Sequence, residues 1–123
     1  MGNDFHIFRL AEVYLMKAEA ILRNGGSGAE AAKYVNAICE RAWGDSSHNY
    51  ATVTLADVQL ERRLEFAWEL FSRQDMIGVG KFNPPGFLVP ETTPDYRKLY
   101  PVSFTAWQTN PNLTQNPGYP AFN

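Results

Sequence analysis

Residues 8–23 have the sequence FRLAEVYLMKAEAILR, and this stretch decides the fold. Its apolar residues recur every three or four positions, a spacing that places them along one face of an α-helix. Asn3 or Asp4 can cap the start of this helix, and the two glycines at 25 and 26 suit its end. The spacing therefore predicts a helix over about residues 4–24.

The same reasoning predicts two further helices. Ser27 and Glu30 have the spacing of a capping box at the start of a helix over about residues 28–43, and Thr54 with Asp57 begins a long helix over about 55–79. The first two helices, joined by a short glycine turn, resemble a tetratricopeptide-like helical hairpin. Their apolar stripes predict one shared core, formed by Leu10, Tyr14, Ala18, Val35, Ile38, Leu64, Ala67 and Phe71.

The sequence changes character after Gly80, because all eight prolines of the chain lie beyond it. Proline lacks a backbone N–H and biases the preceding residue away from the helix, so residues 80–123 are predicted to be irregular, with one short turn near 103–107. This tail is also rich in Phe, Tyr, Trp and Leu, and we expect it to wrap on the helices. The prediction is a single all-α domain, residues 1–123.

Composition excludes several classes of protein. With 11 Lys and Arg against 13 Asp and Glu, the chain has no positive field to attract the phosphates of a nucleic acid. The single cysteine, Cys39, allows neither an intrachain disulfide nor a cysteine-based zinc site, and its place on an apolar stripe predicts a buried small side chain. The start of the chain resembles the middle of a domain, so we expect a piece of a longer protein.

Two motifs invite a catalytic or cofactor-binding interpretation. Residues 26–31 match the dinucleotide-binding pattern G-x-G-x-x-A, but a helix precedes them where that pattern needs a strand, so they predict a hairpin turn. A charged cluster comprises Glu61, Arg62, Arg63, Glu65, Glu69 and Asp75. Its glutamates, spaced by four, share one helix face and could bind a metal or transfer protons.

A structural role for the charged cluster is the favoured interpretation. Both histidines, His6 and His48, lie far from it in the sequence, and its arginines can neutralise its acids. We expect Arg62 or Arg63 to pair with an acid of another helix, namely Glu12, Glu19 or Glu40. No catalytic, cofactor-binding or metal-binding set is predicted, and the chain is not expected to be an enzyme.

The aromatic residues outside the helical stripes are candidate ligand contacts, because flat rings stack on sugar faces as well as filling cores. Most of these rings are expected to serve in packing. Trp107, Tyr96 and Tyr50 are the candidates for contact with a sugar.

Three stretches together resemble the SusD/RagB family, the outer-membrane glycan-binding lipoproteins of Bacteroidetes. Residues 8–20 are similar to the family's R-x-A-E-x-Y-L-x-x-A-E-A helix, and residues 35–42 stand in the place of its N-x-x-R-x-R-A segment. Residues 61–69 resemble E-R-R-x-E-L-A-x-E and lead into 73–82, which is similar to R-Q-D-L-I-R-F-G-K-F. The final stretch, 110–119, resembles the closing N-P-N-L-x-Q-N-P-G-Y.

This resemblance implies a surface-exposed lipoprotein of the cell outer membrane, several times longer and carrying a lipoprotein signal. Such a protein captures oligosaccharides, without cleaving them, for nutrient uptake by a SusC-type TonB-dependent transporter in polysaccharide utilisation. This chain would be its C-terminal scaffold and would itself bind glycans weakly or not at all. An apolar patch around Phe5, Phe8 and Val13 would be uncovered and could support a dimer of the fragment. The alternative is a tetratricopeptide-like protein–protein interaction module.

Overall fold

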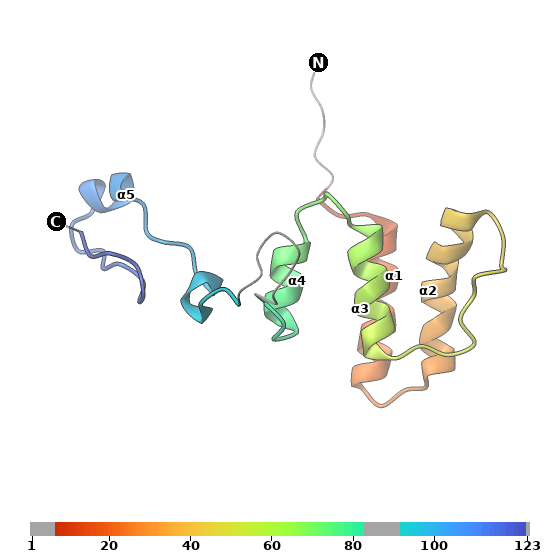
Figure 1. The fold of residues 1–123 in the computed structure, drawn as a ribbon. Coiled ribbons are helices and arrows are strands. Elements are labelled where there is room, and N and C mark those ends of the chain that lie inside the picture. Colours follow the sequence, from red (N-terminus) through yellow and green to blue (C-terminus); the bar gives the residue numbers. More distant parts are fainter. Residues whose placement is uncertain (1–6, 83–91, 123) are drawn as a thin grey trace, which may run out of the picture. The chain divides into compact units, whose positions relative to one another are not determined.

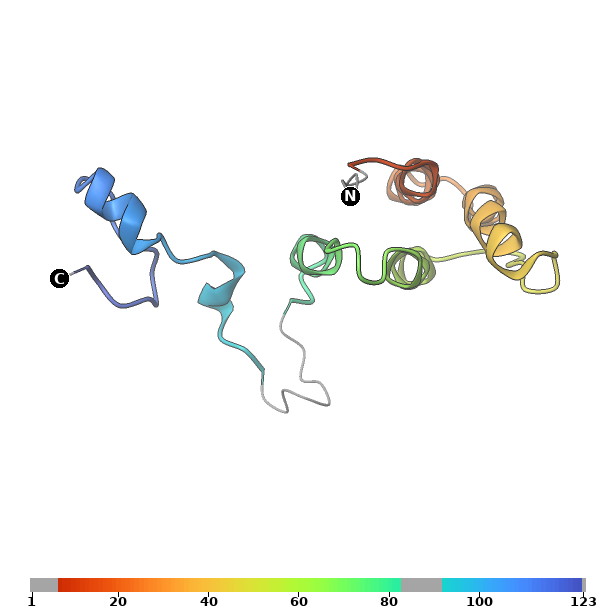
Figure 2. The ribbon, with the colours of Figure 1, turned by 90° about the horizontal axis from the view of Figure 1, so that it is seen from above.

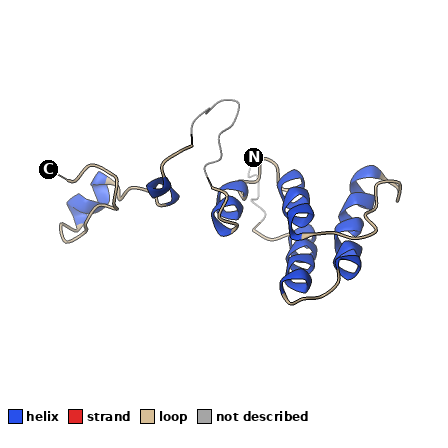
Figure 3. Ribbon diagram, turned by 60° about the horizontal axis from the view of Figure 1, so that its bottom comes forward, coloured by secondary structure: helices blue, strands red, loops and turns tan. Residues whose placement is uncertain are grey.

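The computed structural model describes residues 7–82 and 92–122, and within these ranges the chain is helical with no strand (Figures 1 and 3). This confirms the predicted all-α class. The chain divides into two compact units, Met1–Phe71 and Ser72–Asn123. No helix of the described residues is long and apolar enough to cross a bilayer. The elements are α1 (Leu10–Arg23), α2 (Gly28–Trp43), α3 (Leu55–Glu65), α4 (Ser72–Gly78), the 3-10 helix η1 (Asp95–Lys98) and α5 (Phe104–Thr109).

Helix α1 begins later than predicted. Asn3 and Asp4 lie outside the described residues, and the backbone of Arg9 is still extended, with φ −141° and ψ 158°, so the helix starts at Leu10. The guanidinium of Arg9 is instead bonded to glutamates near the end of α3, which draws the segment before α1 away from the helical path.

The predicted caps of the next two helices are confirmed. The Ser27 hydroxyl accepts a hydrogen bond from the backbone N–H of Glu30, and Gly44 ends α2 in the left-handed conformation. Thr54 and Asp57 form a reciprocal capping box at the start of α3. Hydrogen bonds from Thr54 lower the pKa of the Asp57 carboxyl, because they favour its charged form.

The glycine-rich motif at residues 26–31 forms the turn between α1 and α2, as predicted. Gly28 lies against the segment that leads into α3: a Cβ at this position would fall 2.3 Å from the Thr52 hydroxyl oxygen, and Val53 N–H donates to the Gly28 carbonyl. The glycine is therefore required for close packing between the two segments, with no strand before it to deliver a nucleotide.

The prediction of one long helix over residues 55–79 is wrong. Helix α3 ends at Glu65, and the turn that follows holds Trp68 and Leu70 at φ 70° and 66° before α4 begins. A left-handed conformation costs a non-glycine residue about 1–2 kcal/mol. The turn brings the rings of Phe66 and Phe71 to 4.9 Å, a contact that an unbroken helix would not allow at a spacing of five residues.

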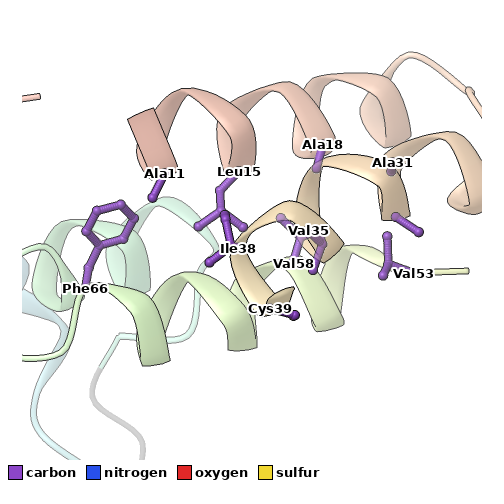
Figure 4. Close-up of a cluster of buried hydrophobic side chains, with 11 residues drawn as sticks. Ala11, Leu15, Ala18, Ala31, Val35, Ile38, Cys39, Val53, Val58 and Phe66 are labelled. Carbon is purple, nitrogen blue, oxygen red and sulfur yellow. The ribbon is translucent and has the colours of Figure 1, made fainter. Parts of the chain in front are cut away.

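The core of the first unit lies where α1 packs against both α2 and α3 (Figure 2). Ala18 and Ala31 are fully buried, and such small side chains let α1 and α2 approach closely. Leu15, Val35 and Val58 fill the space between the three helices (Figure 4). The buried apolar residues are Ala11, Leu15, Ala18, Ala31, Ala32, Val35, Ile38, Cys39, Val53, Val58 and Phe66.

The predicted core is right in part. Ala18, Val35 and Ile38 are buried, and Tyr14 and Phe71 pack against them, but Leu10, Leu64 and Ala67 are exposed. The inward face of α3 follows the four-residue step through positions 58, 62 and 66. Residue 64 lies two positions from that line and is therefore about 200° away around the helix.

The second unit is held together by hydrogen bonds between side chains and backbone. The Gln115 amide donates to the Val102 carbonyl and accepts from the Val102 N–H, which replaces the pairing that a strand would provide. Asn116 and Tyr119 donate to the carbonyls of Tyr100 and Leu99. The predicted turn is found as α5, capped by Ser103. Packing of this tail on the helices of the first unit stays a prediction.

Leu15→Ala should lower the free energy of unfolding by about 2–5 kcal/mol, because it opens a cavity where Leu15 is only 1% exposed. Leu64→Ala is the matched control: its side chain is 62% exposed, so its loss should cost under about 1 kcal/mol. Chemical denaturation followed by circular dichroism measures both. Equal losses for the two variants would contradict the observed orientation of α3.

Candidate functional site

A groove lies between the second half of α2, the segment at residues 45–50 and α3. Its volume is about 710 Å³, which is within the range of about 300–1,000 Å³ usual for small-molecule sites. Apolar and polar side chains both line it, a combination suited to a ligand with apolar faces and hydroxyl edges. The lining residues are Ile38, Cys39, Ala42, Trp43, Ser47, His48, Asn49, Tyr50, Glu61, Leu64 and Glu65.

Hydrogen bonds hold the segment at residues 45–50 against α2. The Asn36 amide donates to the Tyr50 carbonyl and accepts from the Tyr50 N–H, both at 2.9 Å. Asn49 donates to Glu40, which tethers the middle of the segment. Asp45 accepts from the N–H and hydroxyl of Ser47, and these bonds lower the pKa of its carboxyl. The wall of the groove is thus pre-formed.

Glu61 accepts the best-defined polar contact of the groove. The Tyr50 hydroxyl donates to its Oε1 at 2.7 Å, and the Cys39 thiol lies 3.8 Å from its Oε2. The hydrogen bond to the carboxylate raises the pKa of Tyr50 to about 12. Burial, with the nearby negative charge, raises the pKa of the Cys39 thiol, so Cys39 is held as a neutral buried side chain, as predicted, rather than as a nucleophile.

An aromatic pair forms part of the same groove. The ring centroids of Trp43 and His48 are 4.0 Å apart at an interplanar angle of 35°, and Trp43 remains 63% exposed. Trp43 is not among the three rings that the sequence analysis selected for contact with a sugar. The signal available was a tryptophan directly before the helix-ending Gly44.

The charged cluster forms ion pairs between α1, α2 and α3. Arg9 pairs with Glu65 and with Glu69, the latter at 2.7 Å, and these hydrogen bonds raise the pKa of Arg9. Glu65 also pairs with Arg41 at 2.7 Å. These pairs join the segment before α1 to the end of α3.

The expected pairing of an α3 arginine with another helix is confirmed. Arg62 lies 3.3 Å from Glu12, and both side chains are largely buried. Arg63 is exposed and Asp75 lies in the second unit. The structural role assigned to the cluster as a whole stays a hypothesis. Among the described residues, no group of three or more His, Cys, Asp or Glu side chains is arranged to hold a metal ion.

The two candidate rings of the tail belong to separate clusters within the second unit. Trp107 stacks on Phe122, with ring centroids 5.1 Å apart and an angle of 14°. Tyr96 meets Tyr119 edge to face at 4.9 Å, and Gly118 packs so tightly on the Tyr96 ring that a Cβ there would fall 2.4 Å from it. A role for either ring in sugar binding stays a prediction, as does that of Tyr50, which lies in the groove.

The outer face of α1 carries exposed apolar side chains. Phe8 is 76% exposed and Val13 50%, as expected, whereas Phe5 lies outside the described residues. Ile7, Leu10 and Met16 extend this surface. An apolar surface of this kind is typical of an interaction face.

Comparison with known proteins decides the family. The model of the SusD family matches residues 1–77. The chain belongs to the SusD family. This agrees with the resemblance of its motifs to those of the SusD/RagB family. Two of these motifs are in contact in the structure. Arg9 of the first motif pairs with Glu65 and Glu69 of the second, and Glu12 of the first pairs with Arg62 of the second.

The chain is also similar to individual SusD-family proteins. It is 32% identical over 125 residues to the starch-binding protein SusD of Bacteroides thetaiotaomicron, across 95% of this chain and 22% of that protein. It is 35% identical over 85 residues to a SusD-like protein of Bacteroides ovatus, across 68% of this chain and 15% of the relative. The matches thus span 22% and 15% of the length of these two relatives.

One solved structure resembles the fold closely. Surface glycan-binding protein A from Bacteroides uniformis superposes with a TM-score of 0.76 and 30% sequence identity. The superposition covers 94% of this chain and 28% of that protein.

Glu65→Gln should destabilise this SusD-family chain by about 2–3 kcal/mol, because it leaves Arg9 and Arg41 without their shared, largely buried carboxylate. Glu19→Gln is the matched control: it breaks an exposed pair with Arg23 within α1 and should cost under about 1 kcal/mol. Urea denaturation of both variants measures the difference. A loss for Glu65→Gln no larger than that of the control would show that the pairs contribute little.

Tyr50→Phe should remove a phenol that ionises near pH 12 rather than near pH 10. The measurement is the phenolate absorbance of the unmodified chain and of the variant as the pH is raised, and the difference between the two titrations belongs to Tyr50. Because folding raises the pKa of Tyr50, its hydrogen bond to Glu61 stabilises the folded state fully below about pH 10. This stabilisation is lost as the pH rises towards 12. At neutral pH the variant should lose about 1.5 kcal/mol of stability.

Tyr34→Phe controls for the loss of a tyrosine hydroxyl as such, since the Tyr34 hydroxyl makes no hydrogen bond within the described part of the chain while its ring packs near Tyr14. This variant should keep its stability within about 0.5 kcal/mol. A difference titration for Tyr50 centred near pH 10 would contradict its bond to Glu61.

Proposed function

We propose that this chain is the C-terminal scaffold of a longer SusD-family protein that captures oligosaccharides without cleaving them. The observation that carries the proposal is the extent of the similarity. Nearly the whole chain aligns with a protein named for starch binding, and nearly the whole fold superposes on one named for surface glycan binding. The motifs responsible lie in the ion pairs that hold the helices together, which suits a scaffold.

The side chains of the first unit support capture rather than cleavage. Glycoside hydrolysis ordinarily needs two carboxyl groups placed on either side of the scissile bond, one of them available as an acid. Glu65 at the end of α3 and Glu69 in the turn that follows are neutralised by arginines, and Glu61 accepts from Tyr50. The two glutamates that line the groove, Glu61 and Glu65, thus lie one turn apart on the same helix rather than on opposite walls.

The proposed partner is a SusC-type TonB-dependent transporter, and the proposed location is the outer membrane, with the longer protein held by a lipid anchor. Both follow from family membership. The exposed apolar face of α1 supports an assembly of this kind, because such a surface is normally covered in the complete protein or by a partner.

A protein-interaction module is the second candidate function. The same α1 face favours it, since a peptide or protein could pack against Phe8, Leu10 and Val13. In that case the longer protein would bind a protein partner and show no affinity for sugars.

Isothermal titration of the longer protein against neutral plant and host oligosaccharides tests the proposal. We expect binding without the release of reducing ends, and co-purification with the transporter encoded beside it. Absence of binding to every oligosaccharide, together with capture of a protein partner, would favour the interaction module. Release of reducing ends would refute a non-catalytic role.

A further inference from the structure

We propose that the groove between α2 and α3 is a subsite for one neutral pyranose residue of an oligosaccharide. Trp43 would contact the apolar face of the sugar, and Glu61 would accept hydrogen bonds from its hydroxyls. This inference rests on the proposed glycan capture, because it names where on this chain a sugar binds.

The tryptophan is held in an orientation suited to stacking. Gly44 adopts φ 82° directly after Trp43, so the chain reverses there and His48 returns to pack on the indole at 4.0 Å. The remainder of the ring is open, since Trp43 is 63% exposed. A fixed, open indole offers the flat apolar surface on which the C–H face of a pyranose packs.

Glu61 supplies the polar half of the subsite. Among the described residues it has no cation within ion-pair distance, whereas Glu65, one turn later, is neutralised by Arg9 and Arg41. Tyr50 orients the Glu61 carboxylate through Oε1 and leaves further acceptor positions open. Hydroxyl groups of a sugar can donate to them as charge-assisted hydrogen bonds.

The exposed position of Leu64 has an explanation in this subsite. Its side chain does not join the core but lines the groove together with Trp43 and Glu61. The lining therefore combines apolar side chains with a carboxylate, a combination that suits the apolar faces and hydroxyl edges of a pyranose. The groove volume of about 710 Å³ accommodates such a residue, with an open side for the rest of the oligosaccharide.

The charge of the groove selects the sugar. Besides Glu61, the adjoining acids Glu40 and Asp45 accept hydrogen bonds from Asn49 and Ser47 but make no ion pair within the described residues. A uronate brought to this surface would be repelled, because like charges in a partly desolvated site are unfavourable. The subsite should therefore take neutral sugars and reject acidic ones.

The indole N–H signals of the three tryptophans in a nitrogen–proton NMR spectrum test this subsite on the 123-residue chain. Titration with a panel of neutral gluco-, manno-, xylo- and galacto-oligosaccharides should shift the Trp43 signal for at least one of them. The signal of Trp68 serves as an internal control for non-specific contact, since Trp68 is fully exposed. Oligogalacturonate should shift none.

Two variants assign the contacts. Trp43→Ala and Glu61→Gln should each lower the association constant for the responding oligosaccharide, measured by isothermal titration, about tenfold or more. Trp68→Ala, which removes the other exposed tryptophan of the first unit, should leave it unchanged. Glu61→Gln keeps the shape of the side chain, so we expect the variant to keep its fold. Comparison of its NMR spectrum with that of the unmodified chain checks this.

The outcomes separate this inference from the proposed function. If the longer protein binds glycans but no neutral oligosaccharide shifts the Trp43 signal, the subsite is refuted and glycan capture stands. A shift of the Trp68 signal as large as that of the Trp43 signal, or an effect of Trp68→Ala equal to that of Trp43→Ala, would also refute it. If neither the longer protein nor the 123-residue chain binds any oligosaccharide, the subsite and glycan capture are refuted together.

Discussion

The first unit depends on the contact between Arg9 and the end of α3. The Arg9 guanidinium forms hydrogen bonds with Glu65 and Glu69 and lies 4.3 Å from the centre of the Phe66 ring. One side chain thus contacts residues that lie 56–60 positions further along the chain. Ending α3 at Glu65 places these two carboxylates and the ring on the side of α1. The helix start at Leu10, the turn after α3 and the buried Phe66 all adjoin this contact.

The same contact gives the glutamates in and just after α3 different partners. Glu61 and Glu65 lie one turn apart on α3, Glu69 lies in the turn that follows, and their surroundings differ. Arg9 and Arg41 neutralise the later two, whereas Glu61 faces Tyr50 and the groove. Of these three glutamates, Glu61 alone has no arginine partner within the described residues, so its negative charge is left in the groove.

Much of the fold could be predicted because its signals are local. The caps at Ser27 and Thr54 depend on residues three positions away, so the starts of α2 and α3 were predicted correctly. The break after Glu65 could not be predicted from local preference, since Trp68 and Leu70 are poor residues for a left-handed turn. The prediction that Leu64 is buried was wrong for a related reason. Periodicity identifies an apolar stripe on a helix, but it does not show which face of the helix packs against the neighbouring helices.

The sequence by itself determined the helical class, the hairpin turn, the caps and the membership of the SusD family, because each depends on residues close together in the chain or on motifs carried whole. The tertiary structure alone decided which carboxylate stays unpaired, and it alone brought Trp43, Tyr50 and Glu61 to one groove. That arrangement depends on the distance between helices and on the rotation of α3 against α1. Both are set by packing around Leu15, Val35 and Val58, and no local preference encodes them.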